Sequence, residues 1–390
     1  MKIEVKKIMQ TEFVKGFQDF DGDKAEKRSE IKKILVDVLE LYGFQPAETP
    51  VIEYENFVKG SSDQSKDEAI SDIFKLEDKG KRKLALRYEF TFQLKRLMKN
   101  KKLPYRRYQI GPVFRDEPVS KNRFRQFIQC EADVVGSTIK DEAEMISLAE
   151  TILEKLGVKS KVYFNNRKLL NEILDEQKIK NKAEVIREID KLDKLPEKKV
   201  EENLRKFKAE KILVIFKKPK SFFKKYESFS EIEELEKLCK NYGAEIEFLP
   251  SLARGLSYYT GMIFEIKSNI KESIFGGGTY TFGGVQSTGF GVSIERLDSV
   301  SKINLEKEKY LIVSLNQDKR SVFLANKLRK EGKPASLYYG KPSKALQYAN
   351  SYSFNKVIFV GAKEVEENKF KVKDMKTGKE GYLTSRINIY

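Results

Sequence analysis

A short stretch of this sequence places arginines, an amide and carboxylates in an order that could bind a small charged substrate. Arg115 and Arg123 come first, and Gln129, Glu131 and Asp133 follow. Arginine suits phosphate groups because its guanidinium donates parallel hydrogen bonds, whereas carboxylates suit an amino group or a cationic ring. The order of these residues therefore predicts a site for a small zwitterion joined to a phosphate.

Other catalytic chemistries are excluded by residue types that the chain lacks. It contains no histidine and only two cysteines, Cys130 and Cys239. Ser-His-Asp and Cys-His nucleophilic sites, imidazole metal sites, disulfide frameworks and cysteine-rich zinc clusters are thus ruled out. The remaining set of arginine, lysine, tyrosine and carboxylates favours charge stabilisation over proton transfer near neutral pH.

Glycine-based nucleotide motifs are incomplete in this chain. The sequence has neither a Walker-type GxxxxGK[ST] nor a complete GxGxxG. The glycines at positions 276–278 could serve only a tight turn. If ATP binds, we expect it to bind by another mode.

The charged stretch is predicted to lie on a long antiparallel hairpin over residues 105–135, with a polar tip. Alternation of apolar and polar residues on both sides of Pro118 indicates two strands, and side chains two residues apart share a face. The predicted polar face carries Arg123, Arg125, Phe127, Gln129, Glu131 and Asp133, and the predicted core face carries Ile128, Cys130, Ala132 and Val134.

The length of the polar face fits the proposed substrate. Arg125 and Gln129 are separated by about 13 Å at roughly 3.4 Å per residue, which is the scale of a small zwitterion joined to a phosphate. A solvent-facing sheet surface with balanced charges would give the same pattern. The hairpin alone leaves both interpretations open.

The rest of the chain predicts a modular protein. We expect an amphipathic helix over residues 24–42, an extended edge segment over 44–52, and a mostly helical insertion from about 167 to 238. Cations and aromatics alternate over 217–226, a pattern that suits an RNA backbone or a solvated helix face. Alternating strands and helices from residue 310 to 360 predict a separate α/β domain.

Composition is consistent with a nucleic-acid partner. The chain has 390 residues, which suggests two or three domains, and a formal net charge of +17. Such a charge attracts phosphate-rich partners, although solubility alone would also account for it. No run approaches the roughly 18 apolar residues of a spanning helix, and no apolar signal segment begins the sequence. We therefore expect no membrane association and a cytoplasmic location.

Four sequence motifs carry a resemblance to a known family. Residues 114–117 (FRDE) with 123–127 (RFRQF) resemble the second signature motif of class II aminoacyl-tRNA synthetases, and 289–291 (GFG) with 294–296 (IER) resemble the third. The helix and extended segment up to Pro50 resemble the first, which builds the dimer interface in that family. Residues 251–261 (SLARGLSYYTG) are similar to a peptide peculiar to histidyl-tRNA synthetases.

The resemblance implies roles for individual residues. Arg115 and Arg254 match the arginines that act on the α-phosphate, and the amino group of histidine would be held by Glu89, Thr91 and Gln129. The other matches are Arg115, Arg123, Arg296 and Glu117 for ATP binding, and Asp133, Tyr258 and Tyr259 for the histidine side chain. No metal ligand among the protein side chains is implied.

The resemblance also implies an α+β fold and a reaction. We expect an antiparallel-sheet catalytic domain in two parts (1–166 and 239–304), a helical insertion domain (167–238) and an anticodon-binding α/β domain (305–390). The implied activity is ligation of histidine to tRNA(His) through a histidyl-adenylate, with ATP as substrate, Mg²⁺ on its phosphates and a homodimeric enzyme.

Three residues depart from the family pattern. Ser257 stands where many relatives have aspartate, and Thr279 and Thr281 replace the arginine and aspartate of a Gly-Gly-Arg-Tyr-Asp sequence. Alternative functions therefore remain: a histidine-sensing regulatory paralogue without catalysis, a class II ligase of another specificity, or a basic RNA-binding protein. The intact Arg115, Arg254 and Arg296 favour the ligase.

Overall fold

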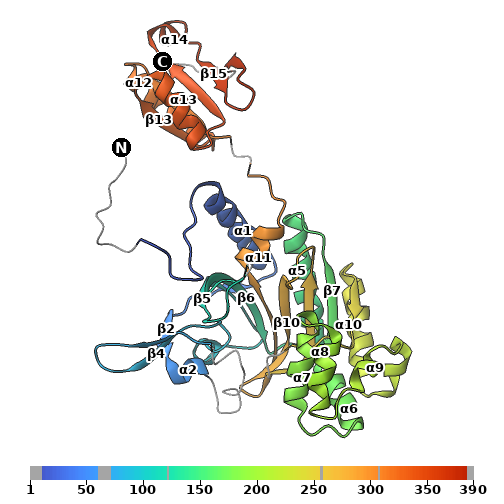
Figure 1. The fold of residues 1–390 in the computed structure, drawn as a ribbon. Helices are drawn as coiled ribbons and strands as arrows, with labels where there is room; N and C mark the ends of the chain where they lie inside the picture. Colours follow the sequence, from blue (N-terminus) through green and yellow to red (C-terminus); the bar gives the residue numbers. More distant parts are fainter. Residues whose placement is uncertain (1–10, 60–71, 121–122, 255–257, 306–307, 384–390) are drawn as a thin grey trace. The chain divides into compact units, whose positions relative to one another are not determined.

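The computed structural model describes residues 11–59, 72–120, 123–254, 258–305 and 308–383 (Figure 1). The chain divides into two compact units. The larger comprises Met1–Asp19 and Arg28–Ile303, and the smaller comprises Phe20–Lys27 and Asn304–Tyr390.

A mixed, mainly antiparallel sheet of eight strands forms the centre of the larger unit, in the order β1-β5-β6-β11-β10-β9-β7-β8. Only the outer pairs, β1 with β5 and β7 with β8, are parallel. The strands are β1 (Gln45–Pro46), β5 (Tyr105–Phe114), β6 (Gln126–Val135), β7 (Lys161–Asn166), β8 (Ile246–Phe248), β9 (Tyr259–Lys267), β10 (Phe275–Phe282) and β11 (Val285–Ser293).

The predicted hairpin is confirmed as the pair β5 and β6, which run antiparallel in unbroken register from Tyr105 opposite Val135 to Phe114 opposite Gln126. Its predicted core face is also confirmed, because Cys130, Ala132 and Val134 are fully buried in the main hydrophobic core and Ile128 packs against it. Alternation along β6 therefore directs Gln129, Glu131 and Asp133 to the opposite face.

Helices cover the core face of this sheet. The helix predicted near residue 24 is α1 (Gly22–Leu41), whose Ile31, Leu35 and Val38 recur at helical spacing and are buried in the main core. The helices α5 (Ile139–Lys155) and α10 (Phe229–Asn241) pack on one another in the same layer (Figure 1). A capping box of Thr138 and Asp141 begins α5.

The insertion is helical, as the sequence predicted. It contains α6 (Arg167–Glu176), α7 (Lys182–Asp190), η2 (Lys191–Asp193), α8 (Glu197–Arg205), α9 (Ile212–Phe216) and η3 (Lys220–Lys225). In the segment that alternates cations with aromatics, Phe223 and Tyr226 are buried in the core, and Phe223 packs edge-on against Phe248. These two rings therefore anchor the segment to the core, and the RNA-backbone interpretation of the segment stays a prediction.

A second, three-stranded sheet precedes the hairpin in the chain, in the order β2-β4-β3. The extended segment expected over residues 44–52 is divided, since β1 joins the large sheet whereas β2 joins this one. The elements are β2 (Ile52–Tyr54), α2 (Glu55–Lys59), β3 (Lys75–Glu77), β4 (Lys83–Leu86) and, after them, α4 (Leu94–Leu97).

The smaller unit contains the predicted βαβαβ pattern. Its sheet has the order β13-β12-β14-β15-β16, with the first three strands parallel and the last two antiparallel. The elements are β12 (Tyr310–Ser314), α12 (Asp318–Lys330), β13 (Ala335–Tyr339), α13 (Pro342–Ser351), β14 (Lys356–Val360), α14 (Ala362–Glu366), β15 (Lys371–Asp374) and β16 (Glu380–Tyr382).

Candidate active site

Arg115 follows β5 directly and lies between two aromatic rings. Its guanidinium carbon is 4.4 Å from the ring centroid of Tyr88 and 5.0 Å from that of Phe127, and its Nη2 donates to the Gln129 side-chain oxygen over 3.1 Å. Burial lowers the pKa of Arg115, but Tyr88 and the carboxylates of Glu117 and Glu89 outweigh this effect and raise it. The guanidinium is thus charged and sterically fixed.

Arg296 belongs to α11 (Ile294–Val300), which begins where β11 ends. The Ser293 side chain accepts a hydrogen bond from the Arg296 backbone N–H over 3.1 Å and so caps the helix. The neighbouring Glu295 is buried, pairs with Arg28 at 2.7 Å and accepts from the Ile128 backbone N–H of β6. These contacts fix α11 against the hairpin and hold Arg296 beside it.

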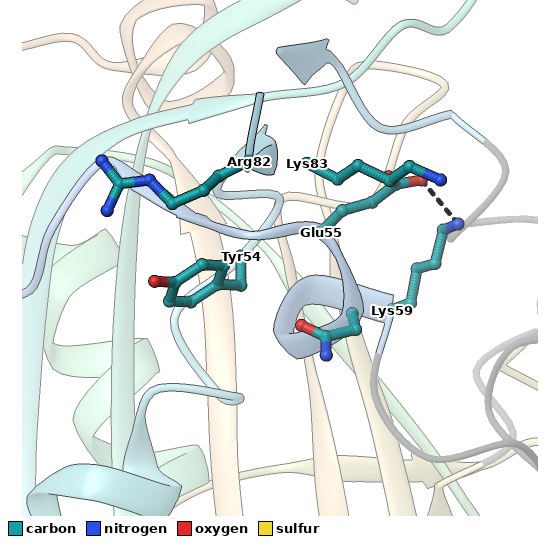
Figure 2. Close-up of a pocket in the computed structure, with 6 residues that line it drawn as sticks. Tyr54, Glu55, Lys59, Arg82 and Lys83 are labelled. Atoms are coloured by element: carbon teal, nitrogen blue, oxygen red, sulfur yellow. Dashed lines mark ion pairs between the residues drawn. The ribbon is translucent and has the colours of Figure 1, made fainter. Parts of the chain in front are cut away.

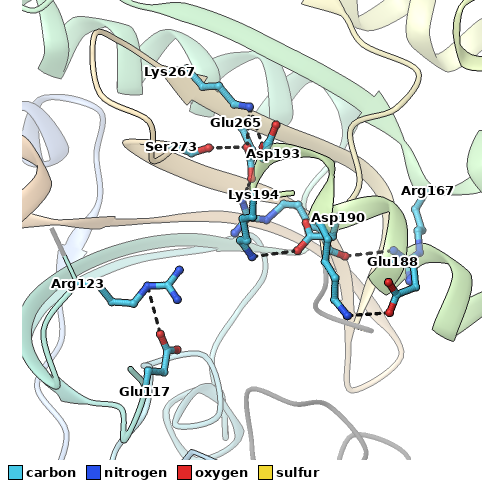
Figure 3. A network of polar contacts seen from close by, with 12 residues as sticks. Glu117, Arg123, Arg167, Glu188, Asp190, Asp193, Lys194, Glu265, Lys267 and Ser273 are labelled. Carbon is cyan, nitrogen blue, oxygen red and sulfur yellow. Dashed lines mark hydrogen bonds and ion pairs between the residues drawn. The ribbon is translucent and has the colours of Figure 1, made fainter. Parts of the chain in front are cut away.

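The arginines near the hairpin form a cluster of like charges. Burial lowers the pKa of Arg296, and the nearby Arg115, Arg123 and Arg254 lower it further. Arg123 is partly exposed, and its Nε lies 3.6 Å from a carboxylate oxygen of Glu117 (Figure 3). Because repulsion by the other guanidinium groups adds to the effect of burial on the pKa of Arg296, a bound polyanion would stabilise the cluster.

Arg254 comes from a different part of the sheet. Its Nη1 is paired with Glu265 of β9 at 2.9 Å, and its guanidinium lies 5.6 Å from the ring centroid of Tyr259. The carboxylate of Glu265 also accepts from the Ser273 hydroxyl over 2.5 Å and lies 3.8 Å from Lys267 Nζ (Figure 3). Burial lowers the pKa of Arg254, but Tyr259 and Glu265 reverse this effect and raise it strongly.

Space for Arg254 depends on the glycine run. The three glycines lie in the middle of β10 rather than in the tight turn that the sequence suggested. A Cβ atom at Gly276 would lie 2.0 Å from Arg254 Nη1. The absence of a side chain at this position therefore admits the guanidinium against the sheet.

Three carboxylates are buried next to the arginine cluster. Glu89, Glu131 and Asp133 are only 5%, 6% and 4% exposed. This burial excludes the interpretation that the polar face of the hairpin is a solvent-facing sheet surface at Glu131 and Asp133. Glu131 accepts from the backbone N–H of Phe90 over 3.2 Å and from the side chains of Gln129 and Thr91. It thereby joins the loop after β4 to the polar face of β6.

The pKa of each of the three buried carboxyl groups is raised. Burial and the neighbouring Glu131 raise the pKa of Glu89 to about 8. Burial raises the pKa of Glu131 to about 7, because the lowering effect of Arg107 is offset by the raising effect of Asp133. Burial also raises the pKa of Asp133. Burial therefore disfavours the ionised form of these carboxyl groups, and a ligand ammonium would favour that form by supplying an opposite charge.

Tyrosines line the same region. The rings of Tyr258 and Tyr259 lie 4.7 Å apart, and Tyr258 packs edge-on against Tyr280 at 5.8 Å. Burial raises the pKa of both Tyr258 and Tyr259. They remain neutral donors, which can hold a polar ring without adding charge.

Two family models account for almost the whole chain. A model described as histidyl-tRNA synthetase matches residues 16–297, and a model described as anticodon binding domain matches residues 309–388. The chain belongs to the histidyl-tRNA synthetase family. The resemblance stated from the motifs and the expected α+β fold class are both confirmed.

Relatives of similar length support this assignment. A histidine–tRNA ligase of Clostridium acetobutylicum is 33% identical, with 91% of this chain and 93% of the relative covered, and one of Methanocaldococcus jannaschii is 32% identical, with 94% and 95% covered. The crystal structure of histidyl-tRNA synthetase from Nostoc sp. PCC 7120 is similar with a TM-score of 0.82 at 24% identity, over 96% of this chain and 97% of that one.

The structure brings most of the residues implied by the family motifs to one face of the large sheet. Arg115 and Gln129 are in direct contact, Thr91 reaches Glu131, and Arg254 lies over Tyr259. Ser257 and the preceding Gly255 of the 251–261 motif lie outside the described residues.

The departures of this family member have local consequences. Thr279 donates a hydrogen bond to Glu142, a buried carboxylate whose pKa burial raises to about 7. Thr281 lies 3.5 Å from the Thr260 hydroxyl on the exposed side of the sheet. Thr279 therefore provides a hydroxyl, without the positive charge that the family pattern places there.

Sequence reasoning missed two members of the pocket. Arg107 pairs with Asp133 at 2.7 Å, and the Tyr280 hydroxyl donates to the same carboxylate over 2.6 Å. The hairpin prediction contained a signal for Arg107. Two strands of equal length on either side of a central tip place Arg107 opposite Asp133, as the structure shows. Tyr280 gave no such local signal because it comes from β10.

A hollow of about 520 Å³ also lies on the small sheet, lined by Tyr54, Glu55, Asn56, Lys59, Arg82 and Lys83 (Figure 2). Within it Glu55 pairs with Lys59 at 2.6 Å. None of its lining residues belongs to the arginine cluster or to the carboxylate pocket, so we do not include it in the site.

The position of Arg254 can be tested through Gly276. In Gly276→Ala the new Cβ must displace the flexible end of Arg254, because it would otherwise lie 2.0 Å from Nη1. We expect normal folding with loss of histidine-dependent ATP–pyrophosphate exchange by about tenfold or more. Gly381→Ala in β16 is the matched control, since no atom lies within 4 Å of the Cβ that it would add. Equal effects of the two substitutions would contradict the assignment.

The buried carboxylates predict an unusual pH dependence of stability. A pKa of about 8 at Glu89 in the folded protein lies above the ordinary value of 4.5, so the folded state binds more protons than the unfolded state. The free energy of unfolding should therefore fall as pH rises through this window. Thermal unfolding should show this slope in the free protein and a flatter one in Glu89→Gln. The exposed Glu154→Gln should retain the parent slope, and a Glu89→Gln slope as steep as the parent's would refute the prediction.

Proposed function

We propose that this chain ligates histidine to its tRNA in an ATP-dependent reaction that passes through a histidyl-adenylate. The observation that carries the proposal is a chain of two hydrogen bonds that joins the two charge clusters. Arg115 of the arginine cluster donates to Gln129, and Gln129 donates to Glu131 of the carboxylate pocket. One molecule with a phosphate next to an amino acid satisfies both. Relatives 32–33% identical over nearly the whole chain are named histidine–tRNA ligases.

The arginine cluster would bind ATP. Arg115, Arg123 and Arg296 hold the phosphates, because their mutual repulsion is relieved by a polyanion. Glu117, next to Arg123, contacts the nucleotide. Among the described residues, no three potential ligands are arranged so that they could hold a metal ion. Mg²⁺ would be bound by the phosphate oxygens of ATP, because oxygen atoms are its preferred ligands.

The carboxylate pocket would bind histidine. Glu89, Thr91 and Gln129 hold the amino group, for which Glu89 offers a buried oxygen without a hydrogen-bond partner in the described structure. The side chain lies toward the other end of the pocket, which is formed by Asp133, Tyr258 and Tyr259. These assignments place the histidine carboxylate next to Arg115, because Gln129 contacts that arginine.

In the first step a histidine carboxylate oxygen attacks the α-phosphorus of ATP. A new oxygen–phosphorus bond forms, the bond to the bridging oxygen of the β-phosphate breaks, and pyrophosphate leaves. Arg254 and Arg115 stabilise the charge on the α-phosphate, and positioning supplies the rest. In the second step a terminal ribose hydroxyl of the tRNA attacks the carbonyl carbon, and AMP leaves.

The remaining parts of the chain would bind tRNA and a second subunit. The segment matching the anticodon-binding model lies within the smaller unit, so the expected domain at 305–390 would take the anticodon. The parts at 1–166 and 239–304 would form the catalytic domain, and the helices of 167–238 would take part in tRNA binding. We further propose a homodimer in the cytoplasm. Among the described helices, none has the length and apolarity to cross a membrane.

A regulatory function is the second candidate, and a specific observation favours it. A structure titled as an ATP phosphoribosyltransferase regulatory subunit/histidyl-tRNA synthetase, from Bacillus halodurans, is similar with a TM-score of 0.75 at 21% identity. This chain also has threonines at positions 279 and 281. The four retained arginines of the phosphate site support the ligase more directly.

Amino-acid-dependent ATP–pyrophosphate exchange distinguishes the two candidates. With each of the twenty amino acids in turn, we expect exchange with histidine alone, because the pocket must hold an ammonium and a polar ring together. Subsequent charging should require tRNA(His). Histidine binding without exchange would establish the regulatory function, and exchange with a different amino acid would establish another specificity.

The role of Arg254 predicts a specific mutational result. Arg254→Ala should lower the rate of adenylate formation about 10²–10³-fold, the typical cost of removing one preorganised donor to a developing oxyanion. Arg254→Lys should recover little, because the forked donor is lost. Arg205→Ala is the control, since this exposed arginine pairs only with Glu201 at 2.7 Å among the contacts described. A marked loss of thermal stability with an unchanged rate per folded molecule would make Arg254 structural.

A further inference from the structure

Arg107 is a charged residue buried in the carboxylate pocket for which neither the proposed reaction nor the family motifs provide a role. It lies on β5 directly opposite Asp133 of β6 and is fully buried. A buried guanidinium is costly unless its charge and its donors are satisfied. Its position therefore calls for a physical reason.

Only one nitrogen of Arg107 accounts for its contacts in the described structure. Its Nη2 lies 2.7 Å from Asp133 and 3.5 Å from Glu131, and it donates to the Phe90 carbonyl over 3.1 Å. Nε and Nη1 are buried without a hydrogen-bond partner among the described residues. The guanidinium is therefore held from one side, by Asp133, Glu131 and the Phe90 carbonyl, and its positive charge acts on a ligand through these neighbours.

Arg107 gives the pocket two electrically different ends. At the end formed by Asp133 and Tyr280, the guanidinium neutralises the carboxylate and the phenol adds no charge. At the end formed by Glu89 and Glu131, the carboxylates are only weakly compensated, since Glu131 lies 3.5 Å from Arg107. The α-ammonium of an amino acid belongs at the second end, which leaves its side chain at the neutral end.

We propose that Arg107 is a specificity-determining residue that makes this pocket select the neutral form of an imidazole side chain over the imidazolium. The proposal rests on the proposed function and deepens it. A neutral imidazole carries one N–H donor and one acceptor nitrogen, which match an Asp133–Arg107 pair. An imidazolium offers two donors and a charge that Arg107 repels. The same repulsion disfavours side chains that are cationic at every physiological pH.

Titration in the pocket must be separated from titration of the ligand ring. The groups that act electrostatically on Arg107 are Asp133, Glu131, Tyr280 and Tyr105. Glu89 and Arg115 act on Glu131 or on one another and so also affect the pocket. A ratio of affinities between two ligands with the same α-amino and carboxylate groups cancels these contributions. Triazolylalanine serves as the second ligand, because its five-membered ring stays neutral throughout the range used.

The test is equilibrium binding of histidine and triazolylalanine to the full chain by calorimetry, from about pH 5.5 to about pH 8.5, which spans the ring pKa of about 6.5. In the parent protein the affinity ratio of histidine to triazolylalanine should fall about tenfold per pH unit below that pKa, in proportion to the neutral fraction. In Arg107→Gln the ratio should become nearly independent of pH, because an uncompensated Asp133 accepts the imidazolium.

Two further variants control for folding and for general effects of charge. Arg107→Gln with Asp133→Asn keeps this end of the pocket neutral and should retain the parent's pH dependence even if Arg107→Gln alone does not fold. Arg106→Gln removes the adjacent arginine of β5, which pairs instead with Asp141 and Glu144, and should leave the ratio unchanged.

Each outcome decides the proposal. A ratio with the same pH dependence in the parent and in Arg107→Gln, or a ratio independent of pH in the parent, overturns it. If Arg107→Gln does not fold, the double variant Arg107→Gln with Asp133→Asn tests the proposal instead. An affinity ratio that is independent of pH in the double variant contradicts the proposal. Binding with the expected ratio but without ATP–pyrophosphate exchange refutes the proposed ligase while supporting the role of Arg107. Failure of both ligands to bind refutes both.

Discussion

The site depends on two adjoining groups of like charges, the arginine cluster and the carboxylate pocket, which carry opposite signs and which the folded protein neutralises only in part. Burial and the nearby Arg115, Arg123 and Arg254 lower the pKa of Arg296, whereas burial raises the pKa of each of the adjoining carboxyl groups of Glu89, Glu131 and Asp133. Neither arrangement is favourable in the free protein. Under the proposed function, an amino acid joined to a nucleotide phosphate would supply an ammonium to one cluster and an anion to the other, and substrate binding would complete the charge balance that folding leaves open.

Only a stiff scaffold can hold such clusters without collapse, and the sheet provides it. The hairpin of β5 and β6 fixes the spacing from Arg115 to Asp133, and β10 and β11 supply glycines where side chains from the site need room. Gly276 admits Arg254, and a Cβ at Gly289 would lie 2.3 Å from the Asp133 carboxylate. Apolar packing on the opposite face holds the same strands in place. Because side chains alternate along each strand, the apolar face of the sheet stabilises the fold while the opposite, polar face carries the charged groups of the site.

The sequence predicted what local patterns determine. Alternation over residues 105–135 predicted the hairpin and its two faces, and the periodicity of α1 and of the C-terminal strands and helices predicted those elements. Short strands such as β3, β15 and β16 were missed because three or four residues carry little periodic signal. The glycine run was assigned to a turn because its partner, Arg254, is distant in sequence. Arg107 was missed because an arginine in an alternating strand is usually exposed, and only the strand opposite shows that it meets a carboxylate.

The central claim is that both charge clusters belong to a single binding site for one joined molecule. Competition against a stable histidyl-adenylate analogue with a sulfamoyl linkage tests it most directly. One equivalent of the analogue should abolish calorimetric binding of histidine and of ATP together, and its own affinity should exceed that of either by several orders of magnitude. If either ligand binds the saturated protein with unchanged affinity, the clusters are separate sites and the account is wrong.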